Sequence, residues 1–139
     1  MSNAAVELNG RTYSWPKDPV VAVCIDGSQL GYIEEAVKAG VAPFFKRDME
    51  EKTNRLARCV IPAFTNPNNI SIVTGRPPVV HGICGNFFYD READSETMMN
   101  DPKFLRAETI FRAFQRRGAK ICVITAKDKL RSNRRSRRR

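Results

Sequence analysis

Thr65 is well placed in this sequence to act as a nucleophile. It opens a polar cluster after an apolar run, and the pattern that follows it predicts a short helix ending near Gly75. Pro67 suits the first turn of a helix, because its φ is preset and it has no amide hydrogen to leave unpaired. Unpaired amides and the helix dipole at such an end favour an anion. Thr65 could therefore be an ordinary helix cap, or a nucleophile whose alkoxide is stabilised by the helix and by a metal.

Asp26 is a second candidate, because it directly follows the apolar run of residues 20–25. That run is rich in β-branched residues, as expected of a strand buried on both faces of a parallel sheet. Open α/β sheets place their chemistry at the carboxyl ends of such strands. A carboxylate there suits zinc or another divalent cation, whereas the alternative is that Asp26 caps a helix from Ser28 onward.

Asn86 and a pair of lysines complete the set of candidate residues. Asn86 follows Gly85 in a predicted turn, where its amide could donate to a phosphoryl oxygen or could serve only to shape the turn. Lys127 and Lys129 follow a predicted strand, at the same carboxyl edge as Asp26 and Thr65. Lysines in such a position are usually solvated surface charges.

Histidine and cysteine give no sign of a metal cluster. The single histidine is His81, and a lone histidine is more often a structural residue than a ligand, so we assign it no direct catalytic role. The four cysteines form no CxxC pair, and those at 24 and 122 lie in apolar runs. We interpret them as reduced core residues of a cytoplasmic protein.

The expected elements alternate along the chain and predict an α/β fold. Apolar runs at 20–25, 58–63 and 119–124 predict strands, with a further strand at 87–89. Helical spacing predicts helices at 29–38 and 107–117. Residues 90–101 are expected to form a loop near the mouth of the active site. This order indicates a three-layer sandwich with a mostly parallel sheet.

Three separated motifs resemble the phosphonoacetate hydrolases of the alkaline phosphatase superfamily, a type I phosphodiesterase/nucleotide pyrophosphatase-like group. They are FTNPNNISIVTGRPPVVHGICGNFFYD at 64–90, VCIDGS at 23–28 and TAKDKLR at 125–131. The resemblance implies hydrolysis of the carbon–phosphorus bond of phosphonoacetate at a site with two zinc ions. It also implies an alkaline phosphatase-like fold and is compatible with a homodimer.

The resemblance assigns a role to each candidate residue. Thr65 would be the metal-bound nucleophile, and Asp26 would share a metal with it. Asn86 would contact the phosphonate, and Lys127 and Lys129 would hold the neighbouring carboxylate. The remaining Asp and His ligands of the family lie beyond the present sequence. We therefore expect half of a metal site, an incomplete fold and an inactive, truncated chain.

Positive charge is concentrated in the last nine residues. Residues 131–139 contain six arginines and no acid, which account for six units of the net charge of +9. We expect residues 1–130 to be the N-terminal part of the hydrolase domain and 131–139 to be a disordered tail, out of frame with the gene. Nucleic acid could bind through this tail alone, which gives a non-enzymatic alternative. A second alternative is another phosphodiesterase or nucleotide pyrophosphatase of the superfamily. No signal peptide or membrane span is expected.

Overall fold

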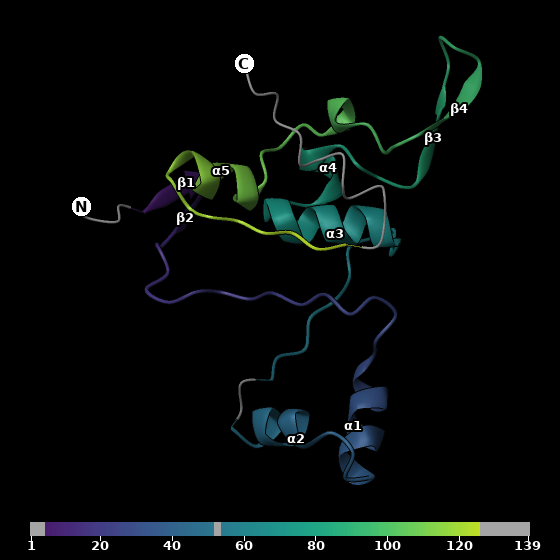
Figure 1. The fold of residues 1–139 in the computed structure, drawn as a ribbon. Coiled ribbons are helices and arrows are strands. Elements are labelled where there is room, and N and C mark those ends of the chain that lie inside the picture. Colours follow the sequence, from purple (N-terminus) through teal and green to yellow (C-terminus); the bar gives the residue numbers. More distant parts are fainter. Residues whose placement is uncertain (1–4, 52–53, 126–139) are drawn as a thin grey trace. The chain divides into compact units, whose positions relative to one another are not determined.

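The computed structural model describes residues 5–51 and 54–125, which divide into two units (Figure 1). The first unit comprises residues 1–18 and 59–139, and the second comprises residues 19–58. The first holds the candidate residues Thr65 and Asn86, and the second holds Asp26.

The first unit begins with a β-hairpin that packs on a helix. Strands β1 (Val6–Leu8) and β2 (Arg11–Tyr13) pair antiparallel. Asn9 and Gly10 connect them with φ values of 50° and 71°. Such an Asn-Gly pair is favoured in two-residue hairpins because both central positions need positive φ. The inward side chains of β1 are 3% exposed and pack against α5 (Ile110–Arg116), which agrees with the amphipathic helix predicted at 107–117.

Helix α3 (Thr65–Thr74) is the central element of this unit. It ends at Gly75, whose φ of 64° gives the left-handed conformation that only glycine adopts without strain. Short helix α4 (Pro78–His81) follows and packs against α3 (Figure 1). Ile70 of α3 lies in an apolar cluster with Ile83 and Met99. The helix predicted after Thr65 is therefore confirmed.

A second hairpin follows the turn that contains Asn86. Strand β3 (Phe87–Asp90) pairs antiparallel with β4 (Ser95–Met98), and a single turn of 3-10 helix, η1 (Pro102–Phe104), comes next. The strand predicted at 87–89 is confirmed. The loop predicted at 90–101 is wrong in part, because the second strand lies within it. Sequence patterns did not predict this strand, because β4 is polar, largely exposed and lacks the alternation of apolar residues by which strands are recognised.

The second unit contains two helices joined by a short connection. Helix α1 (Leu30–Lys38) confirms the prediction at 29–38, and α2 (Pro43–Glu50) begins at a proline. Proline is favoured in the first turn of a helix because its fixed φ is already helical.

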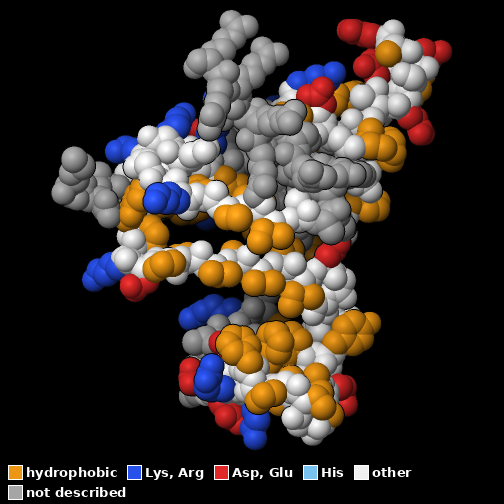
Figure 2. All heavy atoms as spheres, in the orientation of Figure 1, with side chains coloured by type: hydrophobic (Ala, Val, Ile, Leu, Met, Phe, Trp, Pro, Cys, Tyr) orange, Lys and Arg blue, Asp and Glu red, His pale blue; other side chains and the backbone are white. Residues whose placement is uncertain are grey.

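None of the strands predicted at 20–25, 58–63 and 119–124 forms in this structure. Several of their apolar side chains lie at the surface, as the hydrophobic atoms in Figure 2 illustrate, with Val21, Ile61 and Ile124 86%, 91% and 93% exposed. A buried strand requires a neighbour to pair with its amides and carbonyls. Among the described residues, both sheets are two-stranded and antiparallel, so the mostly parallel sheet stays a prediction.

Candidate active site

The start of α3 places Thr65 at the first helical position. Phe64 precedes it with extended backbone and accepts the amide hydrogen bond of Asn68 at 3.1 Å. Phe64, not Thr65, is therefore the N-cap residue, and its side chain makes no capping bond. The first amides of a helix have no acceptor within the helix, and the dipole there favours negative charge. Thr65 thus projects from a helix end that favours an oxyanion, which is the location predicted from sequence.

Asn66 connects this helix end to two segments far away in the sequence. Its side-chain Nδ2 donates to the carbonyl oxygens of Gly85 at 3.1 Å and Met99 at 3.2 Å. Only 8% of Asn66 is exposed, so these bonds lie inside the protein. They join the first turn of α3 to the turn before β3 and to the residue after β4.

Asn86 lies in that turn and is held from both sides. The Gly85 carbonyl, which accepts from Asn66, belongs to the peptide unit that leads into Asn86. The carbonyl of Asn86 itself accepts from the amide of Met99 at 2.8 Å. Asn86 is partly buried, as is Thr65. Thr65 and Asn86, two of the predicted site residues, therefore lie on segments that the side chain of Asn66 joins.

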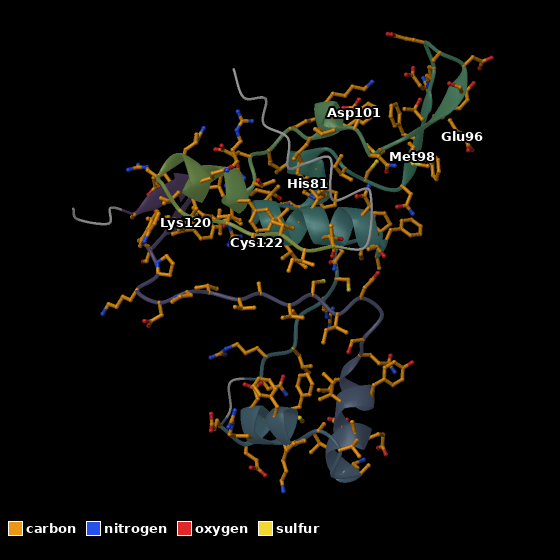
Figure 3. The ribbon with its side chains drawn as sticks, in the orientation of Figure 1. His81, Glu96, Met98, Asp101, Lys120 and Cys122 are labelled. Atoms are coloured by element: carbon orange, nitrogen blue, oxygen red, sulfur yellow. The ribbon has the colours of Figure 1, made fainter. Side chains whose placement is uncertain are left out.

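His81 lies at the end of α4, beside α3 (Figure 3), and has no solvent-exposed surface. Its Nδ1 accepts the amide hydrogen of Ile83 at 3.1 Å, so its proton lies on Nε2, 2.8 Å from Ser71 Oγ. Ser71 in turn donates to the carbonyl of Pro67 at 2.8 Å. Burial lowers the pKa of His81, although backbone hydrogen bonds at His81 and Pro67 oppose that shift. His81 is thus a neutral structural residue, in agreement with the interpretation of its sequence.

Asp26 occupies an exposed position in the second unit. It precedes Gly27, which has a φ of 74°, and the N-cap of α1 is Gln29. The alternative in which Asp26 caps a helix from Ser28 onward is therefore wrong, because α1 begins only at Leu30 and its N-cap is Gln29. Its carboxylate remains a candidate metal ligand.

The described residues do not fit a complete metal centre. They contain no group of three or more His, Cys, Asp and Glu side chains that could hold an ion. Asp26 and Thr65 offer oxygen atoms of suitable chemistry, but zinc in proteins has about four ligands per ion. Lys127, Lys129 and the arginine-rich tail at 131–139 lie outside the described residues.

The cysteines differ from their prediction as core residues. All four are exposed and reduced, including Cys24 and Cys122. The apolar runs that contain Cys24, Cys59 and Cys122 form no strand and therefore cover no core. In the part of the chain that the structure describes, no helix is both long and apolar enough to cross a membrane.

Sequence reasoning missed Asn66 as a component of the site. Its neighbours in the sequence are cap-forming residues, and an asparagine among them signals no more than a helix start. The bonds that define its role span 19 and 33 residues, and no local pattern predicts them.

Comparison with known proteins identifies the family of this chain. Residues 20–134 match the family model of type I phosphodiesterase / nucleotide pyrophosphatase. That range includes Thr65, Asn86 and Asp26, as well as both lysines.

Two solved structures are similar over 95% of this chain, each with a TM-score of 0.89. Both are of phosphonoacetate hydrolase from Sinorhizobium meliloti 1021. One is in complex with phosphonoacetate, at 56% identity, and the other is in complex with phosphonoformate, at 57% identity. The fold of this chain is therefore alkaline phosphatase-like, as the resemblance of its motifs implied.

A curated relative is more distant. It is an ectonucleotide pyrophosphatase/phosphodiesterase, C27A7.1, from Caenorhabditis elegans, 29% identical over 127 residues, or 82% of this chain. The present chain spans 13% of that protein and 32% of each solved hydrolase chain.

Proposed function

The chain belongs to the type I phosphodiesterase / nucleotide pyrophosphatase family, and on that premise we propose that it forms part of a metal-dependent phosphonoacetate hydrolase. Such an enzyme cleaves the carbon–phosphorus bond of phosphonoacetate and yields acetate and phosphate. The observation that carries the proposal is the bridge from the Thr65 end of α3 to the Asn86 turn, formed by the side chain of Asn66. Buried hydrogen bonds thus connect the segment that carries the Thr65 hydroxyl to the segment that carries the Asn86 amide. The similarity to hydrolase structures that contain phosphonoacetate and phosphonoformate supports this substrate class.

Thr65 is the nucleophile of this proposal. Its Oγ gives up its proton to water and attacks phosphorus, so that a Thr65–O–P bond forms as the carbon–phosphorus bond breaks. The electron pair of that bond leaves with the acetate carbon as an enolate, which takes a proton from water. A second water then attacks phosphorus, releases phosphate and restores the hydroxyl. Location at the first position of α3 supports this role, because the helix end stabilises negative charge on the attacking oxygen.

Asn86 neutralises charge on the phosphoryl group in the same scheme. Its side-chain amide donates to a non-bridging oxygen, where charge develops during the transfer. A donor contributes most when it does not have to reorganise during the reaction. The carbonyl of Gly85 and the carbonyl of Asn86 itself both accept hydrogen bonds within the protein, which supports a fixed position for Asn86.

Asp26 is proposed as a ligand to a metal, with Thr65 as a second oxygen donor. Two zinc ions would supply a Lewis acid for the phosphoryl oxygens and lower the pKa of a bound water. The described residues alone provide too few ligands for a complete centre.

Lys127 and Lys129 are proposed to bind the carboxylate of phosphonoacetate. Their charges would orient the substrate and stabilise the enolate as it forms. These residues belong to the match with the family model, and they distinguish a substrate with a carboxylate from other phosphoryl compounds. We also propose that the apolar runs at 20–25, 58–63 and 119–124 become strands of a mostly parallel sheet in the complete domain of a cytoplasmic enzyme.

The test uses a hybrid enzyme, in which this chain replaces the matching segment of the Sinorhizobium meliloti phosphonoacetate hydrolase. Release of phosphate from phosphonoacetate by the hybrid, abolished by Thr65→Ala, would support the proposal. A folded hybrid that releases no phosphate would refute it.

A second candidate function is hydrolysis of nucleotide pyrophosphates or phosphodiesters. The family description and the relative from Caenorhabditis elegans favour it. The same hybrid decides between the two functions. Faster turnover of a p-nitrophenyl phosphodiester than of phosphonoacetate would favour the phosphodiesterase.

A further inference from the structure

Asn66 makes two long-range hydrogen bonds with a single nitrogen atom. Its Nδ2 lies 3.1 Å from the carbonyl oxygen of Gly85 and 3.2 Å from that of Met99. Asn66, the donor, is buried, and the two residues that accept from it, Gly85 and Met99, are buried as well. Asn66 is the immediate neighbour of Thr65, so the two bonds begin at the residue next to the proposed nucleophile.

We propose that Asn66 is a positioning residue, which fixes the Asn86 turn relative to Thr65. The inference rests on the proposed function and adds a residue to it. The Gly85 carbonyl belongs to the peptide unit before Asn86, and the Asn86 carbonyl to the unit after it. The first accepts from Asn66 and the second from the amide of Met99, whose own carbonyl also accepts from Asn66. One of the two bonds at the Asn86 backbone is therefore made by the Asn66 side chain, and the other comes from Met99, which the same side chain also bonds.

The chemistry of the bridge requires a primary amide of this length. An amide nitrogen carries two hydrogens and can serve two carbonyls at once. An aspartate has the same shape, but its ionised oxygens only accept hydrogen bonds and would repel both carbonyls. A glutamine keeps the two donors and moves them by one methylene group.

The same molecule contains a matched control at the other end of α3. Asn9 also donates from Nδ2 to two carbonyls, those of Thr74 at 2.9 Å and Glu108 at 2.8 Å. This bridge joins the end of the helix to the segment before α5, and the Thr65 and Asn86 segments take no part in it. Asn9 has a φ of 50°, so Asn9→Gly removes the bridge without imposing strain on the backbone.

The first measurement is hydrogen exchange at the Met99 amide, which donates to Asn86, in the 139-residue chain. Asn66→Ala should raise the exchange rate at Met99 by at least about tenfold relative to wild type, because the turn loses its anchor. Asn9→Gly should leave Met99 unchanged. Equal exchange of Met99 in wild type and Asn66→Ala would overturn the proposal, whether or not the chain takes part in catalysis.

The second measurement is steady-state hydrolysis of phosphonoacetate by the hybrid enzyme. A shift of about 1 Å in a positioned group can reduce a rate about 10²-fold. We therefore expect kcat to fall about 100-fold in Asn66→Ala and Asn66→Asp, less in Asn66→Gln, and less than about threefold in Asn9→Gly. A loss in Asn66→Ala no greater than that in Asn9→Gly would show that the residue serves stability alone.

A double-mutant cycle tests whether Asn66 acts through Asn86. If it does, Asn66→Ala should cost little in a hybrid that already carries Asn86→Ala, because the group it positions is gone. Multiplying losses in the double variant would overturn the proposal. An inactive wild-type hybrid would refute the proposed function instead, and exchange at Met99 would still decide whether Asn66 holds the turn.

Discussion

Replacing His81 by leucine tests how the helix that carries Thr65 is supported. His81 has no exposed surface and makes hydrogen bonds with both ring nitrogens, to the Ile83 amide and to Ser71. Leucine is similar in size and apolar, so His81→Leu removes both hydrogen bonds without opening a large cavity. The variant therefore isolates the polar contribution of the ring.

The expected loss follows from the two partners left behind. Ile83 is 3% exposed, so its amide would have no access to water, and a buried unpaired donor costs about 1–3 kcal/mol. Ser71 would lose one bond but could still donate to the Pro67 carbonyl, so its loss is nearer to about 1 kcal/mol. We predict that His81→Leu lowers the free energy of unfolding by about 2–4 kcal/mol.

Urea denaturation of the chain, followed by far-ultraviolet circular dichroism, measures this free energy. Ser71→Ala is the control: it leaves the Ile83–His81 bond in place and should cost less than His81→Leu. The reasoning would be refuted if His81→Leu changed the free energy of unfolding by less than about 0.5 kcal/mol, the usual limit for a surface substitution.

Three further predictions concern pH, backbone conformation and substrate recognition. Burial holds the pKa of His81 below the ordinary value of 6.5, so the folded chain binds this proton less readily than the unfolded chain. The contribution of His81 to the free energy of unfolding should therefore be full above about pH 6.5 and fall as the pH decreases toward the lowered pKa. Urea midpoints measured across this pH range should decline less in His81→Leu than in wild type. Gly75→Ala should lower the free energy of unfolding by more than the about 1–2 kcal/mol that a left-handed backbone costs, because the new Cβ would lie 2.5 Å from Tyr13 Oη. Gly118→Ala is the control in the same denaturation assay, because Gly118 has a φ of 90° and no atom lies within 4 Å of its Cβ position. Equal losses in the two variants would contradict the clash with Tyr13. In the hybrid enzyme, Lys127→Ala should reduce kcat/KM for phosphonoacetate about 100-fold, the equivalent of about 3 kcal/mol, and spare a p-nitrophenyl phosphate ester; equal losses on both substrates would remove the role in carboxylate binding.

Local patterns predicted helices α1, α3 and α5 and the position of Thr65 at the start of α3. Pro67 and Gly75 mark the start and end of α3 through their own backbone preferences, which act within a few residues. The Asn86 turn and the strand after it were predictable for the same reason. These features depend on residues close together in the sequence.

The features that failed depend on distant partners. The run at 20–25 has the composition of a buried strand, but composition does not supply the neighbouring strand, and the run forms no strand here. Strand β4 is polar and forms because β3 pairs with it. The role of Asn66 arises from carbonyls 19 and 33 residues away, which a local reading cannot identify.

The central claim is that Thr65 Oγ bonds to phosphorus during the reaction. The measurement that tests it most directly is mass spectrometry of the hybrid enzyme, quenched with acid during turnover of phosphonoacetate and digested to peptides. We predict a phosphate ester on Thr65, absent from the Thr65→Ala variant and absent without substrate. Turnover of phosphonoacetate that persists in Thr65→Ala, or a phosphate found on another residue in its place, would contradict the claim.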